Sequence, residues 1–116
     1  MNANKLWCGL LLSGVMSAVY AQTPAGDVGA GQKAYMKNMC DACHGTAGQG
    51  GDRGAGPKIA PNPFPFEAFN MQMRRPRAVM PRYSEEFLSA KDMADIYAYM
   101  LSIKEGPKAK DIPLLK

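Results

Sequence analysis

The sequence has few of the side chains with which small proteins build a hydrophobic core. Of the 95 residues that follow position 21, only 14 are Val, Ile, Leu or Phe. A fraction below about 20% is typical of disordered chains unless something other than the chain's own side chains fills the interior. The 116 residues suffice for one small domain, so we expect a single domain and not a multidomain enzyme. This composition therefore predicts a fold stabilised by a cofactor or a cross-link.

The first 21 residues have the pattern of a secretory signal peptide. Lys5 precedes an uncharged apolar run from Leu6 to Val19, and small residues at Val19 and Ala21 fit a cleavage site. A retained membrane anchor is the alternative, but the run is shorter than the ~20 residues of a spanning helix. We therefore expect a signal peptide over 1–21, one domain over 22–105, a C-terminal tail over 106–116, and a periplasmic protein without a membrane span.

The only histidine directly follows two cysteines that lie three positions apart, in the run Cys40-Asp41-Ala42-Cys43-His44. In an exported chain this C-x-x-C-H pattern predicts covalent attachment of one c-type haem. Residues i, i+3 and i+4 share one face of a helix. Both thiols can therefore reach the vinyl groups at the porphyrin edge while the imidazole reaches the iron. The haem would also supply the missing core.

Three other interpretations of the same residues remain. A thioredoxin-like dithiol follows a strand, and nothing before Cys40 has a strand pattern. A structural zinc site needs four ligands, whereas two cysteines and one histidine follow the signal peptide. A disulfide within so short a loop would stabilise the fold little.

The remaining patterns predict helices and loops. Asp27 can cap a helix over 28–38, in which Gly31 indicates close approach of another helix. A helix over 66–74 is predicted by apolar periodicity, and Ser89 with Asp92 predicts a capped helix over 90–103. Ser84 can cap a brief helix over 84–88. Segment 45–65, rich in Gly and Pro, is expected to be a loop.

Taken in order, these features resemble the class I c-type cytochromes of bacteria over about residues 26–103. The shared features are the opening helix before the C-x-x-C-H run, Gly56-Pro57, Met80-Pro81 and the closing helix from Asp92 to Leu101. The resemblance implies an all-α, cytochrome c-like fold of three to five short helices around one covalent haem, with a long Gly/Pro loop. It further implies that the first and last helices cross where Gly31 and Tyr35 meet Ile96 and Tyr99.

The second axial ligand of the iron is expected to be Met80, opposite His44. Met80 lies in an extended stretch fixed by Pro81, and the resembling family places its ligand methionine before such a proline. The other methionines after His44 fit helices: Met71, Met73, Met93 and Met100. The alternative role for Met80 is packing in the core. The resemblance also implies that the Pro57 carbonyl accepts a hydrogen bond from His44.

These residues predict a periplasmic one-electron carrier with His/Met-ligated iron, and not an enzyme. It would act alone or as the cytochrome subunit of a dehydrogenase or oxidase. The alternative is an open-site haem protein, a gas sensor or weak peroxidase, if Met80 does not bind iron. A net charge of +3 after the signal peptide is too small to indicate nucleic acid. The partners would be redox proteins with an acidic docking surface, attracted by Arg74, Arg75, Arg77 and Arg82. The alternative roles for these four arginines are pairing with the haem propionates or solvation on an ordinary exposed loop.

Overall fold

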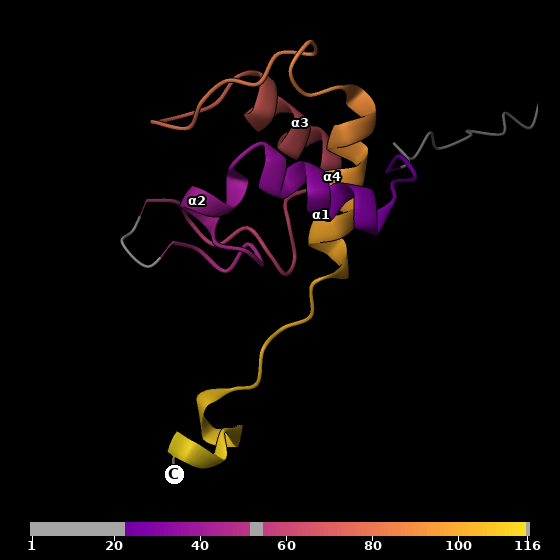
Figure 1. Ribbon diagram of the computed structural model, residues 1–116. Helices are drawn as coiled ribbons and strands as arrows, with labels where there is room; N and C mark the ends of the chain where they lie inside the picture. The colour runs from indigo at the N-terminus through magenta and orange to yellow at the C-terminus, as the bar shows by residue number, and fades with distance from the viewer. Residues whose placement is uncertain (1–22, 52–54, 116) are drawn as a thin grey trace, which may run out of the picture.

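A computed structural model describes residues 23–51 and 55–115, so the predicted signal peptide lies outside the described residues. The regular structure consists of α1 (Val28–Lys37), α2 (Cys40–His44), α3 (Phe66–Arg74) and α4 (Ala90–Ser102), followed by two 3₁₀ turns, η1 (Ala109–Asp111) and η2 (Pro113–Leu115). No strand occurs in these ranges, and the all-α prediction is confirmed. Figure 1 shows α1 lying across α4, α3 beside α4, and the tail leading away from the helices.

No helix within the described ranges combines the length and apolar character needed to cross a bilayer.

Local capping determines where the two longest helices begin. The Asp27 carboxylate accepts a hydrogen bond from the Ala30 N–H at 2.6 Å, and α1 begins at the next residue. At α4 the Ser89 hydroxyl and the Asp92 carboxylate form the reciprocal capping box that the sequence predicts. Helix α3 has the predicted bounds, whereas α1 and α4 each end one residue earlier than predicted.

The crossing of α1 and α4 depends on a glycine. A Cβ atom at Gly31 would lie 1.9 Å from the main-chain oxygen of Asp95, so no other residue fits without moving a helix. One turn further along α1, the rings of Tyr35 and Tyr99 pack edge to face with centroids 5.5 Å apart. The helix crossing implied by the family resemblance is therefore present.

Buried Asp95 joins the two helices by hydrogen bonds. Its carboxylate accepts from the Asp27 N–H at 2.8 Å and from the Lys91 ammonium one turn earlier on α4. Only 3% of Asp95 is exposed, whereas Lys91 projects into solvent. The hydrogen bond from Lys91, followed by that from Asp27, lowers the pKa of the Asp95 carboxyl below its usual value.

We expect Asp95→Asn to lower the melting temperature at pH 7 by about 4–8 °C, because the hydrogen bonds from Asp27 and Lys91 lose their charged acceptor. The folded-state pKa lies below the unfolded-state value, so the stabilisation is present above about pH 4 and is lost as the pH falls through the folded-state pKa. The melting temperature of the variant should therefore fall less than that of the wild type between pH 7 and pH 2. Asp111→Asn, on the exposed tail, is the control; equal profiles for the two variants would contradict the role of Asp95.

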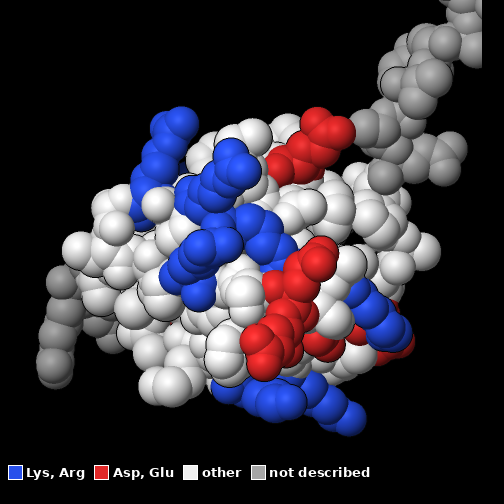
Figure 2. Space-filling view, turned by 90° about the horizontal axis from the view of Figure 1, so that it is seen from above, with Lys and Arg blue, Asp and Glu red and all other residues white. Residues whose placement is uncertain are grey.

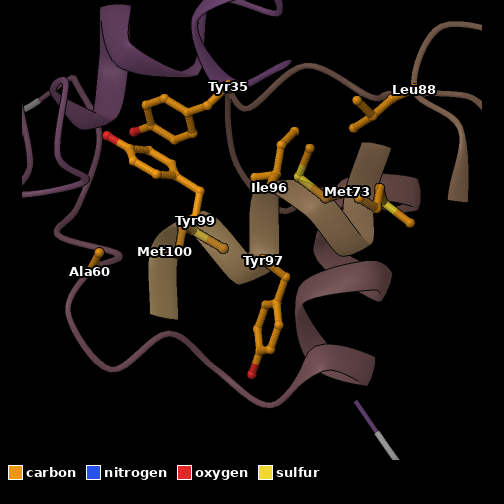
Figure 3. Close-up of a cluster of buried hydrophobic side chains, with 9 residues drawn as sticks. Tyr35, Ala60, Met73, Leu88, Ile96, Tyr97, Tyr99 and Met100 are labelled. Atoms are coloured by element: carbon orange, nitrogen blue, oxygen red, sulfur yellow. The ribbon is translucent and has the colours of Figure 1, made fainter. Parts of the chain in front are cut away.

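The core is small and contains several thioethers (Figure 3). Its largest fully buried side chains come mainly from α1 and α4: Tyr35, Leu88, Met93, Ile96 and Met100. Met73, from α3, is 2% exposed, and the rings of Phe66 and Tyr97 pack edge to face. Leucine and isoleucine thus occupy few core positions, as the composition predicts.

Tyrosine hydroxyl groups attach the irregular segments to the helices. Each of four tyrosines donates a hydrogen bond of 2.7–3.0 Å to a main-chain carbonyl of a distant segment: Tyr35 to Gly45, Tyr99 to Thr46, Tyr97 to Phe64 and Tyr83 to Asn38. Two of these carbonyls lie at the start of the Gly/Pro segment 45–65 and one lies near its end. The segment is therefore held against α1 and α4 without pairing as a strand.

The helix predicted over 84–88 is a single turn. The Leu88 N–H donates to the Ser84 carbonyl at 3.0 Å, but the chain then leaves the helical path before α4 begins. The Ser84 hydroxyl is buried and makes no hydrogen bond, so the predicted cap is not formed. One turn supplies too few internal hydrogen bonds to persist as a helix by itself.

Candidate functional site

The cysteines and the histidine lie on the short helix α2, directly after α1. Asn38 and Met39 separate the two helices, and Met39 has a left-handed backbone conformation with φ of 59°, which turns the chain between them. Cys40 is half-buried beside the core, Cys43 is exposed, and neither forms a disulfide. His44 is 9% exposed. One face of α2 therefore presents two thiols and an imidazole, as the helical spacing predicts.

Burial makes Cys40 a poor nucleophile. Desolvation, and then the nearby Asp41 carboxylate, raises the pKa of the Cys40 thiol to about 11. The reactive cysteine of a thioredoxin-like dithiol has a lowered pKa instead. No three His, Cys, Asp or Glu side chains gather as metal ligands in the part of the chain that the structure describes. The thiol-exchange and zinc interpretations of the run thus find no support in the geometry.

His44 is oriented by a main-chain carbonyl. Its Nδ1 lies 2.8 Å from the Pro57 oxygen. A carbonyl can only accept a hydrogen bond, so Nδ1 must carry the proton. The lone pair then resides on Nε2. A neutral imidazole with one nitrogen hydrogen-bonded and the other free is the form that binds a metal ion.

The loop that supplies Pro57 packs tightly behind α2. A Cβ atom at Gly56 would lie 2.7 Å from the Cys43 carbonyl oxygen and 2.9 Å from His44 Nδ1. A Cβ atom at Gly51 would lie 2.6 Å from the same oxygen. The Gly50 N–H also donates to the His44 carbonyl at 2.8 Å. Gly56 thus permits the close approach that brings the next carbonyl to the imidazole.

Met80 has surroundings unlike those of the other methionines after His44. Met73, Met93 and Met100 are at most 2% exposed in the core, and Met71 is 63% exposed. Met80 is half-buried against the core, with its sulfur 3.5 Å from the side-chain nitrogen of Gln72. No sequence pattern marks Gln72, because the contact joins α3 to the segment that follows it.

The segment 75–89, which carries Met80, is attached to the α1–α2 junction. The Tyr83 hydroxyl donates to the Asn38 carbonyl at 3.0 Å, two residues before Cys40. Cys40, Met80 and Tyr83 all pack against the same core cluster. The structure thus brings the segment with Met80 and the helix with Cys40 to one region of the molecule.

The four arginines near Met80 do not form one equivalent cluster. Arg75, Arg77 and Arg82 are exposed. Arg74 is half-buried, and its guanidinium group donates to the carbonyls of Tyr83 and Leu88. Figure 2 shows basic side chains gathered on the face seen from above Figure 1, with acidic side chains beside them. Glu85 and Glu86 follow on the same exposed segment.

The donor set fits a covalently attached haem. Two thiols on one helical face match two vinyl groups, and an imidazole nitrogen and a thioether sulfur, as His44 and Met80 offer, are the types of donor that hold the iron in electron-transfer cytochromes. Buried Tyr35 and Tyr99, beside α2, satisfy their hydroxyls on loop carbonyls and need no further polar partner.

Comparison with known proteins identifies a cytochrome c domain in this chain. Residues 26–100 match the family model for subunit III of the cbb3-type cytochrome c oxidase. The chain is also 37% identical over 84 residues to the cytochrome bc1 complex cytochrome c subunit of Corynebacterium diphtheriae. That match covers 70% of this chain and 29% of the relative, so the chain spans less than a third of that protein's length. No solved structure is significantly similar to this chain.

Proposed function

Because the chain belongs to the c-type cytochrome family, we propose that it is a periplasmic one-electron carrier in which His44 and Met80 are the two axial ligands of the haem iron. Haem c is bound covalently through Cys40 and Cys43, and the protein is an electron-transfer cytochrome. When bound, the haem supplies the redox chemistry, because its iron accepts one electron and later releases it.

The hydrogen bond between His44 and Pro57 is the observation that carries this proposal. It fixes the protonated nitrogen and the ring plane, and it leaves Nε2 as the metal-binding atom. Met80 supplies a soft thioether from a half-buried position, and such a ligand favours the ferrous state and raises the reduction potential. If His44 and Met80 both held the iron, no position on the metal would be left for a substrate, and the protein would transfer electrons without catalysing a reaction.

Met80→Ala tests the ligation. We expect the ferric wild-type protein to show a methionine-to-iron charge-transfer band and the variant to lose it. The reduction potential should fall by on the order of a hundred millivolts or more, because the axial ligand sets the potential of haem proteins over a wide range. The ferrous variant should bind carbon monoxide readily, whereas the wild type should not.

Met71→Ala is the matched control, because Met71 is exposed on the neighbouring helix α3. It should leave the band and the potential unchanged. Loss of the band in Met71→Ala would contradict ligation by Met80, whereas rapid carbon monoxide binding by the wild type would support the open-site alternative.

The partner we propose is a redox protein with an acidic docking surface, as a free acceptor or within a dehydrogenase or oxidase complex. The exposed Arg75, Arg77 and Arg82 lie on the segment that carries Met80. Their placement supports electrostatic steering towards that segment. The relative from Corynebacterium diphtheriae is named as the cytochrome c subunit of the cytochrome bc1 complex, and similarity to it supports a redox protein as the partner.

Replacing Arg75, Arg77 and Arg82 together by Gln is expected to slow electron exchange with an acidic flavodoxin about tenfold at low salt, because steering raises association rates. Stopped-flow rates over a range of ionic strength measure the effect, which should fade as salt screens the charges. The control replaces Lys104, Lys108 and Lys110 by Gln, which removes the same charge from the exposed part of the chain after α4. Equal slowing in the two triple variants would show that net charge alone sets the rate.

A further inference from the structure

The segment 75–89, which carries Met80, has little structure of its own. It contains only short turns, at 78–79 and at 85–87, the second closed by the hydrogen bond from the Leu88 N–H to the Ser84 carbonyl. Ala78 has a left-handed backbone with φ of 58°, which is unfavourable for a residue with a side chain. The segment therefore depends on contacts with the rest of the protein for its shape.

Arg74, the last residue of α3, provides two of these contacts. Its Nη1 donates to the Tyr83 carbonyl at 3.0 Å and to the Leu88 carbonyl at 2.8 Å. Both acceptors lie on the part of the segment that returns towards α4. One guanidinium group thus connects the start of the segment to two points near its end.

The environment of Arg74 is unusual for a charged side chain. Its Nη2 is buried and has no hydrogen-bond partner among residues 23–51 and 55–115. Within the same ranges the one ion pair is that of Lys91 with Asp95, so no carboxylate neutralises Arg74. Burying part of a cation costs free energy that an exposed arginine avoids. A role as a docking charge therefore does not explain its position.

Tyr83 is fixed by hydrogen bonds at its N–H, its carbonyl and its hydroxyl group. Its N–H donates to the Met73 carbonyl at 3.0 Å, its carbonyl accepts from Arg74, and its hydroxyl donates to Asn38. Tyr83 lies three residues after Met80. Fixing it limits how far Met80 can move from α3, where Gln72 contacts the methionine sulfur.

We infer that Arg74 is a positioning residue for Met80, because its hydrogen bonds join the two ends of the segment 75–89 that carries the thioether. This inference rests on the proposed function, since it assumes that Met80 binds the iron. It assigns to Arg74 a role in retaining the ligand, distinct from the docking role of Arg75, Arg77 and Arg82.

Competition by imidazole tests the inference. Imidazole added to the ferric holoprotein binds when Met80 leaves the iron, so its apparent affinity rises with the fraction of open segment. We expect Arg74→Gln to bind imidazole at least about tenfold more tightly than the wild type, because a hydrogen bond to a charged group changes an equilibrium constant by about that factor. Arg75→Gln makes the same charge change on the exposed neighbour and should stay within about twofold of the wild type.

Arg74→Lys is the second variant, for use also if Arg74→Gln does not mature. It keeps the charge but not the planar group that reaches both carbonyls, and its imidazole affinity should lie between those of the wild type and Arg74→Gln. Melting temperatures of the same proteins measure general destabilisation separately from ligand exchange.

Two negative results have different meanings. A ferric wild type without the methionine-to-iron band would overturn the proposed ligation and this inference with it. A wild type with that band, lost in Met80→Ala, together with Arg74 variants that bind imidazole no more tightly than Arg75→Gln, would overturn the role of Arg74 alone.

Discussion

Gly31→Ala is expected to destabilise the protein by at least about 3 kcal/mol, a large part of the 5–15 kcal/mol typical of a folded domain. The added methyl group would lie 1.9 Å from the Asp95 oxygen and 3.0 Å from the Ile96 nitrogen, both of which belong to the main chain of α4. A main-chain atom within a helix cannot rotate away as the end of a side chain can. The two helices would have to separate, which would also disturb the packing of Tyr35 against Tyr99.

Gly29→Ala on the same helix is the matched control. A Cβ atom there would meet only the Asp27 carboxylate, at 3.5 Å, which is an ordinary contact. Alanine is the better helix former by about 1 kcal/mol, so this variant should be neutral or slightly more stable. Denaturant unfolding of the two holoproteins, followed by circular dichroism, measures the difference. Equal stability of the two variants would show that the helix crossing is not tight at Gly31.

The double variant Cys40→Ala/Cys43→Ala is expected to lose its haem in denaturing electrophoresis and to lose most of its cooperative folding. Only 14 of the 95 residues after position 21 are Val, Ile, Leu or Phe, and the buried cluster is correspondingly small. Without the covalent haem, too little apolar surface is buried to offset the conformational entropy of the chain. Haem staining and thermal melts followed by circular dichroism measure the two effects.

Cys43→Ala alone is the control for this variant, because Cys40 can still form one thioether bond. It should keep haem through denaturing electrophoresis and should melt cooperatively. A double variant that came out colourless but with wild-type helix content and a sharp melt would contradict the role of the haem as the core.

The sequence predicted the helices well because their signals are local. Asp27 and the Ser89–Asp92 pair cap helices through contacts within three residues, and the bounds of α3 follow from its own apolar spacing. Gly31 was predicted as a helix contact from its cost within a helix. Gly26, whose Cβ would lie 2.2 Å from the Ala94 oxygen, was missed because it lies before the helix, where a glycine costs little.

Contacts between distant segments could not be predicted in the same way. The four arginines near Met80 look alike in sequence, yet Arg74 alone among them is bonded to the carbonyls of Tyr83 and Leu88. Those acceptors are main-chain atoms 9 and 14 residues away, and no residue type marks them. The contact of Gln72 with Met80 depends in turn on how that segment folds back.

The tyrosine hydroxyls that hold the Gly/Pro segment leave the protein tolerant of change at their acceptors. Thr46 and Phe64 accept through main-chain oxygens, which every amino acid carries. Substitutions at these two positions therefore leave the hydrogen bonds from Tyr99 and Tyr97 in place. Inserting or deleting a residue would shift the oxygens out of reach of Tyr99 and Tyr97. The number of residues in segment 45–65 is therefore constrained more strongly than the identity of the residues at these two positions.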